Sequence, residues 1–177
     1  MRAMDSLRGQ LLIAAPSLYD YFRRTVVLVL EHGDEGAMGV VLNRSSETAV
    51  ADAVPALAEL AEEGELVRVG GPVAPEAVVA LGEFDDPAEA GTEVLGSLGV
   101  LDPDAENAGL RRVRIYAGYA GWGPGQLDSE LDAGAWIVEP AEPEDPFAED
   151  DIWPRVLQRK GGSYALMAGM PADPSLN

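Results

Sequence analysis

The chain contains RTVVLVLEH at Arg24–His32, the polar link GDEG at Gly33–Gly36, and AMGVVLN at Ala37–Asn43. Two β-branched runs joined by a short link with glycine at both ends predict a β-hairpin. Outside this hairpin, strand and helix patterns are interspersed, and the helical segments are too few and too short for repeated βαβ crossovers. The sequence therefore predicts an α+β fold with a mixed sheet.

Working outward from the hairpin, apolar patterning predicts further strands and three helices. The expected strands are Gln10–Ala14, Ala77–Leu81, Val94–Leu101, Arg111–Tyr119 and Ala135–Val138. The expected helices lie within Thr48–Glu63, where Pro55 delays the regular start to about Ala53, and at Gln126–Ala133 and Ile152–Lys160. The acidic, proline-containing segment Glu139–Asp151 predicts a solvated loop. With no internal repeat or linker, residues 1–177 are expected to form one domain with a loose tail after about residue 167.

The charge balance excludes several classes of partner. Twelve basic residues stand against thirty-one acidic ones, giving a net charge of −19. Such a field repels nucleic acid and anionic membranes, so neither is an expected partner. The longest apolar run, Thr25–Leu30, is too short to span a bilayer, and the first ten residues do not resemble a signal peptide. Together with the absence of cysteine, these features favour a cytoplasmic protein.

The sequence offers no recognisable catalytic apparatus. His32 is the only histidine, which makes a zinc site or a hydrolytic triad improbable. The segment Leu95–Gly99 fails as a nucleophile elbow, because leucine stands where glycine is needed. We therefore expect no catalytic residue, no metal and no cofactor.

The segment GYAGWGPGQ at Gly118–Gln126 lies between an expected strand and an expected helix, where a phosphate-binding loop would occur. Its glycine spacing is wrong for that motif, and Pro124 removes an amide donor. A rigid turn is favoured, in which replacing Gly121 or Gly123 by valine would be destabilising. Trp122 would either pack in the core or face outward to dock a partner, and the sequence leaves this open.

The motifs together resemble the AlgH/YqgE family of bacterial proteins, over nearly the whole chain. The resemblance is carried by GYAGWGPGQLDSE at Gly118–Glu130, by Gly9–Ala14, Arg24–His32, Gly36–Arg44 and Gly70–Val73, and by Trp136 and Trp153. It implies a bent, mixed and mostly antiparallel sheet that forms a partial barrel with flanking short helices. Most members of that family are uncharacterised, and one branch is named for transcriptional control of alginate production. The resemblance supplies no catalytic residues.

Two functional hypotheses follow. The first is a non-enzymatic regulatory or protein-interaction module with a protein partner, linked at most indirectly to transcription. The alternative is an enzyme or small-ligand binder with an unfamiliar polar pocket, which would gain if three or more of Arg24, His32, Asn43, Arg44 and Gln126 converged on one pocket. The candidate site residues for interaction or ligand binding are Arg24, His32, Asn43, Arg44, Gly118, Tyr119, Gly121, Trp122, Gly123, Gly125 and Gln126.

Overall fold

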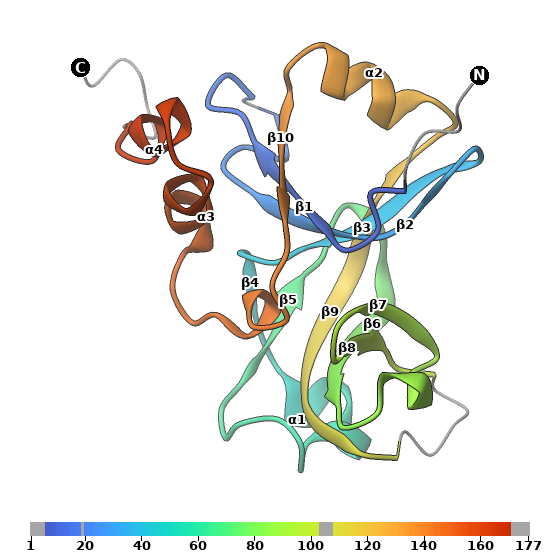
Figure 1. Ribbon diagram of the computed structural model, residues 1–177. Helices are drawn as coiled ribbons and strands as arrows, with labels where there is room; N and C mark the ends of the chain where they lie inside the picture. The colour runs from blue at the N-terminus through green and yellow to red at the C-terminus, as the bar shows by residue number, and fades with distance from the viewer. Residues whose placement is uncertain (1–5, 19, 103–107, 171–177) are drawn as a thin grey trace.

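A computed structural model describes residues 6–18, 20–102 and 108–170 of the chain (Figure 1). Short helices flank a large sheet in this part of the molecule. The strands are β1 (Gln10–Ala14), β2 (Val26–Gly33), β3 (Gly36–Val41), β4 (Ser45–Ala49), β5 (Leu66–Val69), β6 (Val73–Phe84), β7 (Thr92–Leu95), β8 (Leu98–Val100), β9 (Leu110–Trp122) and β10 (Trp136–Pro140). The helices are α1 (Val50–Ala53), α2 (Gln126–Asp132), α3 (Ile152–Lys160) and α4 (Ser163–Met167), with 3₁₀ turns η1 (Pro55–Leu57), η2 (Pro87–Glu89) and η3 (Asp145–Phe147).

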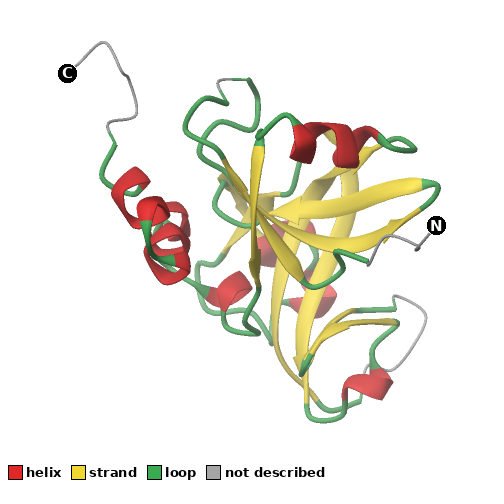
Figure 2. Ribbon diagram, turned by 45° about the horizontal axis from the view of Figure 1, so that its top comes forward, coloured by secondary structure: helices red, strands yellow, loops and turns green. Residues whose placement is uncertain are grey.

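The sheet has the strand order β10-β1-β2-β3-β9-β6-β8-β7, and neighbours along this path are antiparallel. In addition, β5 pairs in parallel with β9 and antiparallel with β4. The sheet bends without closing, so it forms a partial barrel (Figure 2). This confirms the predicted α+β class, and the predicted hairpin appears as β2 and β3.

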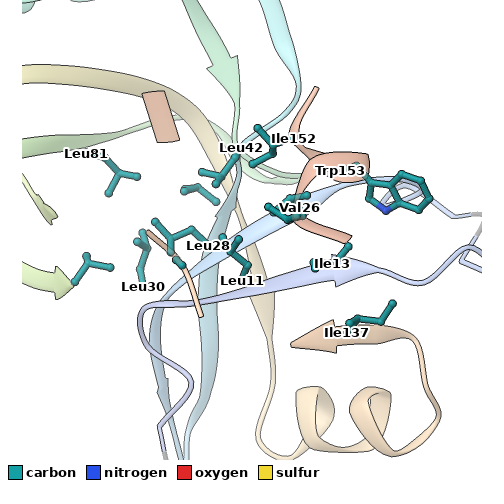
Figure 3. Close-up of a cluster of buried hydrophobic side chains, with 14 of the residues drawn as sticks. Leu11, Ile13, Val26, Leu28, Leu30, Leu42, Leu81, Ile137, Ile152 and Trp153 are labelled. Carbon is teal, nitrogen blue, oxygen red and sulfur yellow. The ribbon is translucent and has the colours of Figure 1, made fainter. Parts of the chain in front are cut away.

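Strand β1 and residues 26–30 of β2 are buried on both faces, which explains their nearly continuous apolar sequences. On one face, Leu11, Ile13, Val26 and Leu28 belong to a cluster that includes Trp153 of α3 (Figure 3). On the other face, a second set of buried side chains packs with α2 and with two further tryptophans: Leu12, Ala14, Val27, Val29, Val41, Ala120, Trp122, Leu127 and Trp136. The two helical layers thus hold these strands between them.

The predicted helix within Thr48–Glu63 is largely wrong. Only Val50–Ala53 is α-helical, and Ser45–Ala49 is the extended strand β4. Pro55 begins the 3₁₀ turn η1 instead of a regular first helical turn. Pairing of β4 with β5 satisfies the backbone here, so tertiary context overrides a local helical pattern.

The acidic segment 139–151 is solvated only in part: most of its acidic side chains are exposed, as predicted, but its middle packs against the protein. Asp145 is buried and accepts two hydrogen bonds from Arg159 of α3, at 3.0 and 2.8 Å. Pro146 and Ala141 are buried beside it. Pairing with Arg159 offsets the free-energy cost of removing the Asp145 carboxylate from water.

The C-terminal part of the described chain ends just after α4. Residues 168–170 continue from this helix, and the rest of the predicted loose tail, 171–177, lies outside the described residues. Within the described chain, none of the helices has the length and apolarity needed to cross a bilayer.

Candidate functional site

The glycine-rich segment is mostly strand, because β9 continues to Trp122 and only residues 123–125 form the turn. Trp122 is 6% exposed and belongs to the core. Its indole N–H donates to Oε1 of Glu130 at 3.0 Å, and the indole of Trp136 donates to the same oxygen at 2.9 Å. The structure thus answers the question that the sequence left open: Trp122 is buried and is not available to dock a partner.

Gln126 fastens the turn that follows Trp122. Its Oε1 accepts the backbone N–H of Gly123 at 3.0 Å, and its Nε2 donates to Oε2 of Glu130 at 2.9 Å. Gly125 has a φ of +75° and caps the start of α2. Gln126 therefore has a role in holding the turn to the helix, although its side chain lies at an exposed position.

Of Gly118, Gly121 and Gly123, only Gly118 has a backbone conformation that requires glycine. Gly118 has a φ of +74°, and a Cβ there would lie 2.5 Å from the carbonyl oxygen of Gly71. A Cβ on Gly121 or Gly123 would meet only ordinary contacts, at 3.6 and 3.9 Å. Gly118 is the position where β9 and the 70–71 backbone come close together, which only glycine permits without strain.

An aromatic path leads from the buried tryptophans to the surface. Phe22 stacks on Trp122 with a centroid distance of 6.3 Å and meets Trp136 edge-on at 5.6 Å. Tyr21 in turn packs edge-on against Phe22 at 5.1 Å, and it is 41% exposed. The side chain that brings this aromatic cluster to the surface is therefore Tyr21. The partly buried Tyr119 packs instead against the first core cluster.

Three of the sequence-predicted residues converge beside Tyr21. The carboxamide of Asn43 accepts the backbone N–H of Val26 at 3.0 Å and donates to the backbone carbonyl of Arg24 at 2.9 Å. It also donates to Oδ1 of Asp151 at 3.0 Å. Arg24 has a φ of 56°, a conformation that is uncommon for a residue with a side chain, and Asn43 holds the backbone that directly follows this strained point, on either side of Thr25.

The two arginine side chains at this place lie on aromatic rings. The guanidinium of Arg44 lies 4.7 Å from the ring centroid of Tyr21, and it donates to the carbonyl of Arg23 at 3.2 Å. The guanidinium of Arg24 lies 4.0 Å from the ring of Trp153 and donates to the carbonyl of Met170 at 3.1 Å. The hydrogen bond to Met170 joins the β1–β2 connection to the turn that follows α4.

Two exposed apolar side chains lie in and just after α4, near the backbone that Arg24 contacts at Met170. Leu166 of α4 is 79% exposed, the highest value among the large hydrophobic residues that the structure describes, and Met170 is 47% exposed. We use the term arginine–tyrosine surface for Tyr21, Arg24, Arg44, Leu166 and Met170. It combines an aromatic ring, two cations and two apolar side chains.

His32 lies elsewhere, at the tip of the β2–β3 hairpin. Its Nδ1 accepts the backbone N–H of Leu7 at 3.0 Å, and its Nε2 lies 3.6 Å from Asp128. It borders an open hollow of about 380 Å³ together with Arg8, Glu31, Asp34, Glu35 and Trp122. Of the five polar residues, Arg24, Asn43 and Arg44 are together, whereas His32 and Gln126 are not. In the described part of the chain, no group of three acidic or histidine side chains is placed to hold a metal ion.

A second polar cluster was not identified from the sequence. Arg114 of β9 is 4% exposed and donates to the carbonyls of Pro146 and Phe147 and, at 2.7 Å, to Glu149. A carboxylate oxygen of Glu65 lies 3.4 Å from the same guanidinium. The hydrogen bond from Arg114 holds the pKa of Glu149 below its usual value. The sequence feature that could have indicated this cluster is an arginine within the apolar run Val113–Tyr116. Its partners could not be foreseen, because they are 32 to 49 residues away in sequence.

Comparisons with known proteins agree with this architecture. A family model described as AlgH-like matches residues 11–165. A UPF0301 protein of Streptomyces coelicolor is 44% identical over 191 residues, covering 100% of this chain and 98% of its own. An X-ray structure of a Corynebacterium diphtheriae protein is similar with a TM-score of 0.87 and 30% identity, covering 96% of this chain and 95% of that one. The solution structure of the AlgH protein from Pseudomonas aeruginosa gives a TM-score of 0.70 at 30% identity, covering 97% and 98%.

Proposed function

Because this chain belongs to the AlgH-like family of bacterial proteins, whose curated relatives carry no assigned activity, we propose its function from its own surface. We propose a non-enzymatic regulatory or protein-interaction module of the cytoplasm that meets a protein partner through the arginine–tyrosine surface. A link to transcriptional control would then be indirect, through that partner.

The observations that carry the proposal are the exposure of Tyr21, Leu166 and Met170, the stacking of Arg44 on Tyr21, and the hydrogen bond from Arg24 to the carbonyl of Met170. Tyrosine and arginine are enriched among the residues that dominate binding energy at protein interfaces. Both arginines are already oriented by stacking on rings, so they lose little side-chain freedom on binding. Because Leu166 is mostly exposed, its side chain adds little to folding stability, and its burial against a partner would stabilise a complex.

The chemistry of this surface also indicates the kind of partner. The chain carries a net charge of −19, yet the arginine–tyrosine surface contains the cations Arg24 and Arg44. A partner segment with aspartate or glutamate next to an apolar side chain would complement both features. Duplex DNA would meet the repulsion of the remaining acidic surface, which argues against direct nucleic-acid binding.

The test is affinity capture from the source cell with the full chain. The double variant Tyr21→Ala, Leu166→Asp changes the proposed surface, and Val78→Asp serves as a matched control, because Val78 is 52% exposed on β6. We expect the wild type and the control to recover the same partner, and the double variant to lose it. Recovery should also fall as salt is raised, because the proposed contact is partly ionic.

Two results would count against the proposal. One is a partner recovered equally by the double variant, which would place the contact elsewhere. The other is self-association alone, seen as a dimer by light scattering that the double variant abolishes, with no other protein recovered. Melting temperatures of the wild type and the control should agree within about 2 °C, since exposed substitutions usually change stability by at most about 0.5 kcal/mol. The double variant should stay folded with a lower melting temperature, because Tyr21→Ala removes the ring that packs on Phe22 and Arg44.

A further inference from the structure

The second polar cluster borders a hollow at the junction of β4, β5 and β9. Pairing places Ser45 opposite Arg68 and Arg68 opposite Tyr116, so three polar side chains form one row across three strands. Arg114 is two residues before Tyr116 and shares its face of β9. The hollow has a volume of about 280 Å³ and is lined by Ser45, Glu62, Glu63, Gly64, Glu65, Leu66, Arg68, Arg114 and Glu149.

The two arginines in this hollow differ in how far their charge is neutralised. Arg114 is held by Glu65, Glu149 and two backbone carbonyls, so its donors are in use. Arg68 donates to the carbonyl of Leu42 at 3.4 Å, and no carboxylate of the described residues lies within 4.0 Å of its guanidinium. Arg68 therefore keeps a charge and several donors for a ligand.

Two buried polar atoms at this cluster have no hydrogen-bond partner among the described residues. They are the hydroxyl of Tyr116, whose side chain is fully buried, and Oε2 of Glu65, whose side chain is 8% exposed. Burial raises the pKa of Tyr116 above its ordinary value, so the phenol stays protonated and is a hydrogen-bond donor. Leaving a donor and an acceptor unpaired is costly, which makes such atoms unusual unless something else binds there.

We propose that this hollow binds a small zwitterion of the free α-amino acid class. Its carboxylate would pair with the fork of Arg68, assisted by the hydroxyl group of Ser45, which also lines the hollow. Its ammonium group would face the carboxylates of the 62–65 turn, with Oε2 of Glu65 as one acceptor. A simple anion would meet these carboxylates, and a simple cation would meet Arg68, so a ligand with both charges fits best.

The size of the hollow agrees with this class. Its volume of about 280 Å³ is near the lower end for small-molecule pockets, which suits a free amino acid such as leucine better than a larger ligand. The proposal rests on groups separate from the arginine–tyrosine surface. Either proposal can therefore fail without the other.

The experiment measures thermal stabilisation of the full chain by each of the twenty common amino acids, followed by calorimetric titration of those that stabilise. L-leucine is then compared with N-acetyl-L-leucine, which lacks the ammonium group, and with L-leucinamide, which lacks the carboxylate. We expect stabilisation by uncharged aliphatic amino acids, and an affinity at least about tenfold weaker for both analogues, because each leaves charged groups unpaired.

Variants test whether amino-acid binding takes place in this hollow. Arg68→Gln should weaken L-leucine binding at least about tenfold, whereas Arg111→Gln, an exposed arginine that pairs with Asp85 at the far end of β9, should leave it unchanged. Tyr116→Phe should raise the Tm of the free protein by about 2–4 °C, because it removes an unpaired buried hydroxyl, and it should leave L-leucine binding unchanged, because Tyr116 does not line the hollow.

Several outcomes would overturn the proposal. They are the absence of stabilisation by any of the twenty amino acids, equal binding of either single-charge analogue, or binding that Arg68→Gln does not alter.

Discussion

At the scale of single residues, Trp122 connects the glycine-rich segment to the rest of the molecule. Its ring packs in the second core cluster, and its N–H reaches Glu130 of α2. Glu130 also accepts hydrogen bonds from Trp136 and Gln126, so one carboxylate joins the end of β9, α2 and the start of β10. A motif that looked like a binding loop in the sequence is a structural joint in the fold.

Replacing this tryptophan should therefore affect stability. We expect Trp122→Ala to lower the free energy of unfolding by about 3–5 kcal/mol, the usual cost of a large cavity left by an aromatic side chain. Urea denaturation followed by circular dichroism measures the change. Trp122→Phe is the control, which should cost less because it keeps most of the apolar volume. A near-neutral Trp122→Ala would contradict burial of the ring.

Gly118 and Gly121 give a second residue-scale prediction, since they lie three positions apart on β9 with different backbones. Gly118→Ala should cost about 1–3 kcal/mol, because alanine would have a positive φ and would crowd the Gly71 carbonyl. Gly121→Ala should stay within about 0.5 kcal/mol, because its Cβ meets only ordinary contacts. Denaturant midpoints of the two variants decide the matter, and equal losses would contradict the assignment of the strain to Gly118.

At the scale of secondary-structure elements, α3 holds the acidic 141–149 segment against the sheet. Arg159 grips Asp145, and its guanidinium also donates to the carbonyl of Pro140 at the end of β10. The hydrogen bonds that Arg159 donates to Asp145 raise the pKa of Arg159 above its ordinary value. On the other side of this segment, Arg112 and Arg114 of β9 flank the ring of Phe147. The segment is thus clamped from a helix and from a strand.

Breaking this clamp at its buried end should be costly. Asp145→Ala leaves Arg159 without its main partner, and we expect a loss of about 3 kcal/mol, at the low end for buried pairs because Arg159 stays partly exposed. Glu144→Ala is the matched control on the same turn. Its carboxylate is mostly exposed in its pair with Arg112, so the change should cost at most about 1 kcal/mol. Thermal or urea unfolding of both variants tests the difference, and a similar small loss in both would show that Asp145 does not anchor the segment.

Elements with strong local signals were predictable from the sequence. Strand β1 and helix α3 have the predicted bounds, because an apolar run ended by Pro16 and a helix capped by Asp151 are encoded locally. Strand β4, the fastening of segment 139–151 and the pairs of Arg114 depend on partners far away in sequence, so no local pattern reveals them. The meeting of Arg24 with Asn43 was foreseen only as one possible outcome, because it depends on how two strands register.

At the scale of the whole molecule, β9 is the strand that both parts of the sheet share. Near its end it pairs with β3, and along its earlier part it pairs with β6 and β5. The first core cluster also crosses between the parts, since Leu81 and Leu98 of the β6–β8 region pack with Leu11 and Leu28. The two parts of the sheet are therefore expected to fold as one unit.

The positions of the three tryptophans allow this expectation to be tested. Trp122, Trp136 and Trp153 all lie in the clusters around β1 to β3, whereas circular dichroism reports on the whole chain. Urea unfolding followed by tryptophan fluorescence and by circular dichroism should give the same midpoint, as for a two-state domain.

A substitution at Val113 tests the coupling at a distance from the tryptophans, because Val113 is buried in the third cluster, which contains no tryptophan. Val113→Ala should cost about 1–3 kcal/mol and shift both curves together, because unfolding near Val113 also removes β9 from the tryptophan-containing part. If the variant shifted the circular dichroism curve and left the fluorescence midpoint unchanged, the two parts of the sheet would be separate folding units, and β9 would not couple them.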